Sequence, residues 1–506
     1  MLLGIDIGTS GTKTVLFDLK GVAVADALVE YPLYQPQNGW AEQNPTDWWR
    51  AVCESVSAVI AKSGVSADDI SGVGLSGQMH GLVMLDENDR VLRKSIIWCD
   101  QRTGLECEQI TDIVGKKKLI DITANPALTG FTASKVRWVQ NNEPEIYAKV
   151  KKIMLPKDYI RYMLTGEFAT EVSDASGMQF LDVPKRGWSG ELLQILGVDI
   201  SFLPKVYESY EVSGKVSQSA AKLTGLNAGT AVVGGGGDQA AGAVGNGIVK
   251  QGIISSTIGS SGVVFAHTDS IQIDPNGRVH TFCHAVPGAW HIMGVTQGAG
   301  LSLKWFRDNF CEKEMADAEK RNIDPYVLMD EMAENTGLGA HALYFLPYLM
   351  GERTPHLDAD CRGMFFGLSA IHTKADMIRA ILEGVGYSLT DCMDIIKGMG
   401  INATQVRLSG GGGKSPIWRQ MQADMFNAKT TIINASEGPA LGVALLAGVG
   451  VGEYSSVAQA CEAAINVKKA YEPISANVEK YKNNHKIYKE LYPAVKNIYK
   501  MKSLYS

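Results

Sequence analysis

The sequence predicts an α/β protein made of two similar domains. Short apolar strands are mixed with amphipathic helices along all 506 residues, a pattern typical of partly parallel sheets. The segments GIDIGTSGTKTVLF (4–17) and SSTIGSSGVVFA (255–266) share a strand, a Gly-Ser/Thr turn and a second strand, and lie about half a chain apart. Glycine is also in excess: 54 residues are about 11% of the chain, against a usual share of roughly 7%.

The elements of the first domain follow from apolar periodicity and from start and stop signals. Asn44 and Pro45 are typical of the N-cap and first position of a helix, which should run to about Ser63. The elements expected are, in chain order, strands at 2–7, 13–18 and 22–31, a helix at 44–63, a strand at 70–75, a hairpin over 82–85 and 90–93, helices at about 100–114 and 156–164, a strand at 231–235 and a helix at 238–247.

The pattern then restarts, so we place the domains at 1–247 and 248–506. The elements expected in the second domain are strands at 252–258, 262–266, 279–285, 289–295 and 405–409 and helices at about 300–310, 374–398 and 415–427. The Lys- and Tyr-rich tail repeats tyrosines at helical spacing, which predicts a last helix at about 475–500.

Composition excludes several classes of function. The formal net charge is −6, and no basic stretch indicates a nucleic-acid partner. The eight cysteines form no C-x-x-C pair, which argues against structural zinc and redox motifs. The start MLLGIDIGTSGTK does not resemble a signal peptide, and no apolar run reaches the roughly 18 residues of a membrane span. We expect a cytoplasmic protein that binds no membrane.

Both Gly-Ser/Thr turns are candidate phosphate sites. Around the first turn Gly8, Thr9 and Lys13 offer backbone N–H groups, a hydroxyl and a cation, which suit phosphate oxygens. Asp6 would repel a phosphate unless Mg²⁺ lay between them. Gly259 and Ser260 could hold phosphate from the opposite side. An ordinary hairpin turn is the alternative in each case, since the spacing is not that of a Walker motif.

Two glycine runs lead from a strand into a helix. After residues 410–413, Lys414 and Ser415 open a helix, and four glycines allow a flat ligand to approach the backbone, although a flexible loop fits equally well. After residues 234–237 comes Asp238, which is either the N-cap of a helix or a general base for a hydroxyl that attacks phosphorus. The glycines therefore gather where ligands are expected, at 8–11, 72–81, 234–247, 259–262 and 410–413.

A lone histidine, His80, follows the strand at 70–75 within the segment SGQMHG. It is either structural, a hydrogen-bond partner for a polyol or an acid–base group. His280 and His284 have a spacing seen in metal sites, but a third ligand is missing nearby, so we do not expect zinc.

Two long segments resemble one family. GFTASKVRWVQNN (130–142) and GMFFGLSAIHTKADMIRAILE (363–383) are similar to the two signatures of the FGGY carbohydrate kinases, which belong to the actin-like, hexokinase-like ATPases. The resemblance covers nearly the whole chain and weakens after about residue 470. It implies two ribonuclease H-like domains, with mixed sheets and flanking helices, around an interdomain cleft.

Within that family the chain resembles the members that phosphorylate D-xylulose at O5. The segments that carry this resemblance are GQMHG (77–81), LPKDY (155–159), GGGD (235–238), TFCHA (281–285), YLMGERTPH (348–356) and ILEGVGYSL (381–389). Glycerol-phosphorylating members have Arg-Glu where this chain has Met79-His80. Two positions depart from the pattern: Cys99 stands where asparagine is common, and Gln239 stands where the D-xylulose members often have asparagine.

The resemblance implies a role for each matched residue, with ATP and the sugar as substrates and Mg²⁺ as cofactor. Asp238 matches the general base, and Asp6 and Asp238 would hold Mg²⁺ through water. The implied sugar contacts are Met79, His80, Trp98, Asp238 and Gln239. The implied nucleotide contacts are Gly8, Thr9, Lys13, Gly259, Ser260, Gly300, Gly411, Gly412 and Ser415. A homodimer is also implied. The alternatives are a kinase for L-ribulose, L-xylulose or a related polyol, and an actin- or chaperone-like ATPase with a protein partner.

Overall fold

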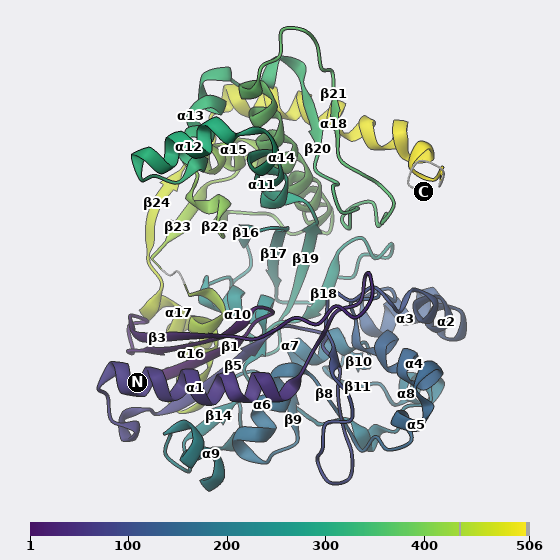
Figure 1. Cartoon of the computed structure of the whole chain (residues 1–506), viewed down its shortest axis with the longest axis vertical. Helices are drawn as coiled ribbons and strands as arrows, with labels where there is room; N and C mark the ends of the chain where they lie inside the picture. Colours follow the sequence, from purple (N-terminus) through teal and green to yellow (C-terminus); the bar gives the residue numbers. More distant parts are fainter. Residues whose placement is uncertain (435–436, 502–506) are drawn as a thin grey trace.

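The computed structural model describes residues 1–434 and 437–501, which form two α/β units stacked along the long axis (Figure 1). The first unit is built on a sheet whose main path contains, from one edge to the other, β3 (Ala23–Glu30), β2 (Gly11–Phe17), β1 (Leu2–Ile7), β5 (Gly72–Gly77), β14 (Ala231–Val233) and β13 (Val212–Lys215). Strands β3, β2 and β1 are antiparallel neighbours, whereas β1, β5 and β14 run parallel. The short β15 (Gly236–Gly237) also pairs with β5.

The second sheet repeats this order. Its strands are β18 (His280–Cys283), β19 (Trp290–Thr296), β17 (Gly262–Thr268), β16 (Ile253–Ile258), β22 (Gln405–Ser409), β23 (Thr430–Ile433) and β24 (Val467–Tyr471). The β16–β17 hairpin matches β1–β2, and β16 lies parallel to β22 as β1 lies parallel to β5. Both sheets also end in an antiparallel edge strand. The two similar domains predicted from the repeated hairpin are therefore confirmed.

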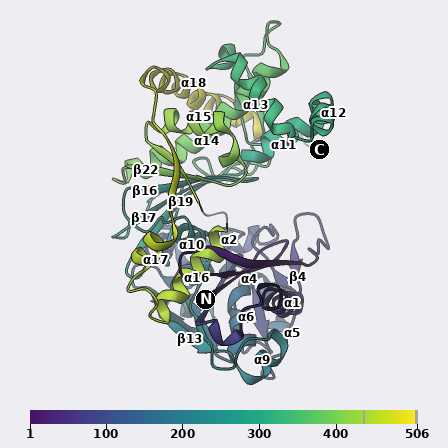
Figure 2. The same cartoon turned by 90° about the vertical axis from the view of Figure 1, so that its left-hand side faces the viewer.

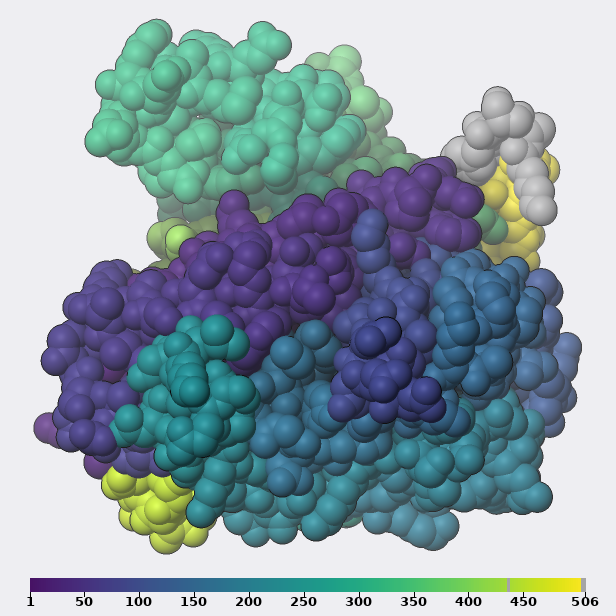
Figure 3. All heavy atoms as spheres, turned by 60° about the horizontal axis from the view of Figure 1, so that its bottom comes forward, coloured from purple at the N-terminus to yellow at the C-terminus, as the bar shows by residue number. Residues whose placement is uncertain are grey.

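The chain returns to the first unit near its end. Helix α16 (Gly438–Gly450) packs on β1, β5 and α10 (Asp238–Gly245), and α17 (Val457–Ala464) packs on α16. Figure 2 shows α16 and α17 beside α10, and in Figure 3 yellow-green residues lie next to purple and teal residues of the first unit. Helices α16 and α17 thus come after the predicted division at 247/248 in the sequence but contribute to the packing of the first sheet, and the division itself stays a prediction.

Glycines bring α16 close to its neighbours. A Cβ on Gly442 would lie 1.8 Å from the carbonyl oxygen of Ala241, and a Cβ on Gly245 would lie 1.8 Å from that of Gly438. On the other side, a Cβ on Gly74 would lie 2.0 Å from the carbonyl oxygen of Val443. Gly74 and Gly245 belong to clusters interpreted above as ligand turns. Their structural role is backbone packing, so that interpretation is wrong for these two positions.

Local sequence signals explain the helix boundaries. Asn44 caps α1 (Pro45–Ser63), since its side chain accepts a hydrogen bond from the Thr46 N–H, and Gly64 ends the helix in the left-handed region. The other helices of the first unit are α2 (Gly104–Val114), α3 (Lys116–Thr123), α4 (Thr132–Asn142), α5 (Pro144–Tyr147), α6 (Pro156–Thr165), α7 (Val172–Ala175), α8 (Gly190–Leu196) and α9 (Gln218–Thr224).

The predicted hairpin over 82–93 is present but short: it consists of one antiparallel bridge between Leu85 and Val91, with the N–H groups of Asp86 and Leu92 donating to the carbonyls of Arg90 and Met84. The longer pairing of β6 (Val83–Leu85) is with β8 (Lys152–Met154), which was not predicted. The Asp86 carboxylate accepts hydrogen bonds from the N–H groups of Asn88 and Arg90, which stabilises the tight turn between the two arms.

Helices cover the second sheet and form the larger apolar core. They are α11 (Ala299–Phe310), α12 (Glu312–Arg321), α13 (Pro325–Thr336), α14 (Lys374–Gly398), α15 (Pro416–Phe426) and α18 (Ser475–Tyr499). Tyr481, Tyr488 and Tyr492 of α18 are buried in this core, so the tail helix packs on its own unit. Among the helices of the described residues, none combines the length and apolarity that a membrane span requires.

Candidate active site

The first Gly-Thr turn connects β1 to β2 and is held by hydrogen bonds from three side chains outside it. Tyr31 donates to the carbonyl of Gly8, Gln43 donates to that of Thr9 at 2.6 Å, and the indole N–H of Trp98 donates to the Thr9 hydroxyl at 2.9 Å. Because these carbonyls point into the protein, the turn can present N–H groups and the Thr9 side chain outward. A predicted nucleotide contact, Thr9, and a predicted sugar contact, Trp98, are thereby held together.

Lys13, opposite Asp6 on the hairpin, forms an ion pair with Glu437, which directly precedes α16. Sequence reasoning did not single out Glu437, because it lies more than 400 residues from Lys13 and only the return of α16 to the first sheet brings them together. Asp6 itself accepts a hydrogen bond from Ser76 at 2.8 Å.

Asp238 is the first residue of α10, and Gly237 occupies the N-cap position. The structure therefore does not support the N-cap alternative. Burial is the main cause that raises the pKa of Asp238 from 3.8 to about 7, and the negative charge of Asp6 raises it further. Burial likewise raises the pKa of Asp6. The two half-buried carboxylates thus repel each other, which favours either a shared proton or a cation between them.

The second Gly-Ser turn, between β16 and β17, is held by the start of α11. The N–H of Gly300 donates to the carbonyl of Gly259 at 2.9 Å, and that of Leu301 donates to Ser260 at 3.1 Å. A side chain at position 300 would collide, because a Cβ there would lie 2.4 Å from the Gly259 carbonyl oxygen.

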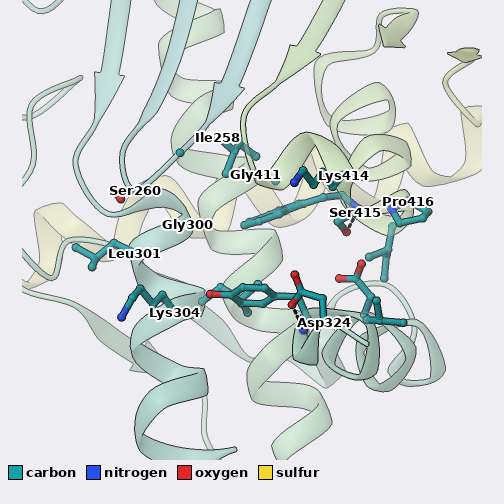
Figure 4. A pocket seen from close by; sticks show the side chains of 18 of the residues that line it. Ile258, Ser260, Gly300, Leu301, Lys304, Asp324, Gly411, Lys414, Ser415 and Pro416 are labelled. Atoms are coloured by element: carbon teal, nitrogen blue, oxygen red, sulfur yellow. Dashed lines mark hydrogen bonds between the residues drawn. The ribbon is translucent and has the colours of Figure 1, made fainter. Parts of the chain in front are cut away.

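A cavity of about 790 Å³ opens beside this turn (Figure 4). It brings together six predicted nucleotide contacts, namely Gly259, Ser260, Gly300, Gly411, Gly412 and Ser415. The floor and walls are mainly apolar, with Ile258, Tyr326 and Trp418 among them. A flat heteroaromatic group fits such a cavity, with any attached phosphates directed to the Gly259 turn.

Sequence reasoning missed the contribution of α13 to this cavity. Asp324, Tyr326 and Asp330 line it, and the hydroxyl of Ser415 hydrogen-bonds Asp330, whose pKa burial raises to about 6. The segment between α12 and α13 carries no glycine-rich turn or motif, so no local signal indicated a binding surface there.

Met79 and His80 follow the end of β5, the strand that pairs with β15 just before Asp238. Met79 is buried beside Gly237, where a Cβ would lie 2.9 Å from its side chain. The His80 ring packs edge-on against Phe131 at 4.8 Å, and its Nδ1 lies 3.1 Å from the carbonyl of Gly177, so Nδ1–H donates and Nε2 is left as an acceptor. Burial holds the pKa of His80 well below its usual value. A neutral ring that accepts from a hydroxyl fits these facts, whereas a proton donor does not.

Arg353 was not predicted and comes from the second unit. A Cβ on Gly130 would lie 3.7 Å from its Nη2 and 3.2 Å from the carbonyl oxygen of Trp98. Its charge also lowers the pKa of His80 and of His280. The segment YLMGERTPH therefore places the Arg353 guanidinium beside the predicted sugar contacts of the first unit.

Similarity to known proteins assigns the chain to a family. The N-terminal domain of the FGGY family of carbohydrate kinases matches residues 1–245, and the C-terminal domain of that family matches residues 254–451. The chain belongs to the FGGY family of carbohydrate kinases. The resemblance drawn from the two signature segments is confirmed, and with it a sugar-kinase fold of two units.

Relatives of this FGGY kinase include xylulose kinases along nearly their whole length. That of Bacillus subtilis is 38% identical over 98% of this chain and 97% of its own. That of Escherichia coli is 40% identical over 88% of this chain and 89% of its own. The crystal structure of ligand-bound xylulose kinase from Lactobacillus acidophilus superposes with a TM-score of 0.91 at 28% identity and covers 98% of each chain.

Proposed function

We propose that this FGGY kinase transfers the γ-phosphoryl group of ATP to O5 of D-xylulose and releases ADP and D-xylulose 5-phosphate. The observation that carries the proposal is the position of Asp238, which directly follows the residue packed against Met79 and is close enough to Asp6 for the charge of that carboxylate to raise its pKa. The similarity to xylulose kinases supports the choice of sugar.

In the proposed reaction Asp238 accepts the proton of the O5 hydroxyl as O5 forms a bond to phosphorus. The bond between the γ-phosphorus and the bridging oxygen breaks, and ADP leaves with that electron pair. Gly8, Thr9 and Lys13 hold the phosphates from the first unit, and Gly259 and Ser260 hold them from the second. Gly300, Gly411, Gly412 and Ser415 surround the adenosine. Met79, His80, Trp98 and Gln239 orient the sugar, and closure of the cleft excludes water.

The residues present fit a magnesium ion. Asp6 and Asp238 are two carboxylates whose mutual repulsion a divalent cation would relieve, and Mg²⁺ is commonly held by one or two carboxylates together with phosphates and water. When bound, Mg²⁺ would neutralise charge on the phosphates. Asp6 would hold the ion through water, and Lys13 would leave Glu437 to contact phosphate.

The raised pKa of Asp238 predicts the pH dependence of the enzyme. A general base must be ionised, so kcat/KM for D-xylulose should fall tenfold per pH unit below about 7 and level off above it. The measurement is a pH profile of kcat/KM with sugar and MgATP both below their KM values, so that it reports Asp238 in the free enzyme, before a cation lies beside Asp6 and Asp238. A plateau that extends unchanged down to pH 5 would contradict either the raised pKa or the base.

A coupled assay for ADP release tests the substrate. We expect the highest kcat/KM for D-xylulose among D-xylulose, L-ribulose, L-xylulose and glycerol, because Met79-His80 replaces the Arg-Glu pair typical of glycerol-phosphorylating members. A higher value for another ketopentose would favour the alternative sugar. ATP hydrolysis that no sugar changes would instead favour an ATPase with a protein partner. A homodimer and a cytoplasmic location remain predictions, and sedimentation of the purified chain tests the first.

A further inference from the structure

The loop that carries Met79 and His80 has an unfavourable backbone. His80 has φ of 69°, in the left-handed region that non-glycine residues rarely adopt. Gly177 faces its ring so closely that a Cβ there would lie 2.3 Å from Nδ1. A conformation of this kind persists only where the surroundings hold it.

Lys135 provides much of the hydrogen bonding that stabilises this backbone conformation. Its side chain, on α4, is fully buried, and its ammonium donates to the carbonyl of His80 at 2.7 Å and to that of Gly130 at 2.6 Å. The Thr132 hydroxyl, one turn earlier on the same helix, donates to the same His80 carbonyl at 3.1 Å. Two side chains of α4 therefore fix the peptide group that follows the His80 Cα.

The same ammonium also joins the two segments that would face the sugar in the proposed function. Gly130 lies beside the carbonyl of Trp98 and the guanidinium of Arg353, as described above, and Phe131 packs on the His80 ring. One cation thus sets the spacing between the His80 loop and the wall formed by Gly130 and Phe131.

Burying an ammonium group lowers the stability of the folded protein, so its presence indicates a role that an apolar side chain cannot fill. Within residues 1–434 and 437–501, Lys135 has no ion pair within 4.0 Å, and burial lowers its pKa to about 7, although Asp100 nearby opposes this. A methionine or leucine would fill the same space at less cost in stability. The hydrogen bonds of Lys135 to main-chain carbonyls are therefore better explained by the site than by the fold.

We propose that Lys135 is a positioning residue for sugar binding, which holds the His80 loop and the Gly130 wall at the separation that the sugar requires. The inference rests on the proposed function only in that the sugar binds beside His80. In the proposed function the adenosine lies on the second unit and the phosphates lie between the turns at Gly8 and Gly259, and the two hydrogen bonds of Lys135, to His80 and Gly130, involve neither turn.

The test compares kinetic constants of Lys135→Met and Thr132→Val with those of the wild type. We expect Lys135→Met to raise KM for the sugar about 10- to 100-fold, since a displacement near 1 Å can cost this much, while KM for ATP stays within twofold. Thr132→Val removes the second donor to the same carbonyl and should raise KM for the sugar by about threefold. Should Lys135→Met fail to fold, Thr132→Val decides the matter alone.

Val139→Ala is the matched control, because Val139 is buried on the same helix but contacts neither loop. It should lower the unfolding temperature and leave both KM values unchanged. An unchanged KM for the sugar in Lys135→Met or, if that variant does not fold, in Thr132→Val would overturn the inference. So would equal changes in both KM values. The wild type is first assayed on the ketopentose panel, and its best sugar is used throughout, so that a wrong sugar overturns the proposed function without touching this test.

Discussion

Replacing Asp238 by asparagine is expected to lower kcat by about 10²- to 10⁴-fold, the contribution usual for a positioned general base. Asparagine has the same shape as aspartate but cannot take the O5 proton. The start of α10 and its contacts with Gly237 and Met79 should stay in place, so the dissociation constants for ATP and for the sugar should change little. Turnover by coupled ADP release and binding by calorimetry measure the two quantities separately.

The same variant should be more stable than the wild type above neutral pH. The folded-state pKa of Asp238, about 7, lies above its ordinary value of 3.8, so ionisation of Asp238 disfavours the folded state as pH rises through 7. Asparagine has no charge to bury, so its advantage in unfolding temperature should be absent at pH 4 and present at pH 8. A variant that keeps near-normal kcat, or that gains no stability at pH 8, would contradict the assignment.

The second large effect concerns the crossing of α10 and α16. Gly442→Ala is expected to lower the free energy of unfolding by about 3 kcal/mol, at the upper end of overpacking costs, because the new Cβ meets the Ala241 carbonyl oxygen, an atom of the backbone. The only relief is to move the helices apart. Because α10 begins with Asp238, kcat should fall together with stability.

Gly398→Ala is the control for Gly442→Ala. Gly398 is also a helical glycine, at the end of α14, but nothing lies within 4 Å of the position of its Cβ. Alanine should stabilise the protein there by roughly 0.5–1 kcal/mol through helix propensity. Thermal unfolding of both variants gives the comparison, and equal stabilities would show that the α10–α16 contact is looser than described.

Much of the fold could be predicted because its signals are local. The two Gly-Ser/Thr hairpins, the Asn44-Pro45 helix start and the strand at 405–409 each depend on residues within a few positions, and the structure has all of them. The cavity beside the Gly259 turn is lined by six residues that the sequence singled out, since they belong to glycine-rich turns that are visible locally. Its binding of a nucleotide stays a prediction.

What sequence reasoning missed depends on partners far apart in the chain. The pairing of β6 with β8, the return of α16 to the first sheet and the ion pair of Lys13 with Glu437 all join segments that no periodicity connects. Arg353 could be found only once the second unit was placed over Gly130. Gly74 and Gly245 were misinterpreted because a glycine that meets a ligand and one that meets a helix backbone look alike in sequence.

The return of α16 also has a consequence for biosynthesis. Leu2, Val15 and Phe17 of the first sheet are buried in an apolar cluster to which α16 contributes apolar residues between 440 and 447, beside residues of α10. A ribosome adds roughly 5–20 residues per second. This face of β1 and β2 is therefore synthesised on the order of tens of seconds before α16, which covers it. The nascent chain must therefore carry an open apolar sheet through most of its synthesis, and the first unit is completed only after nearly all of the second has emerged.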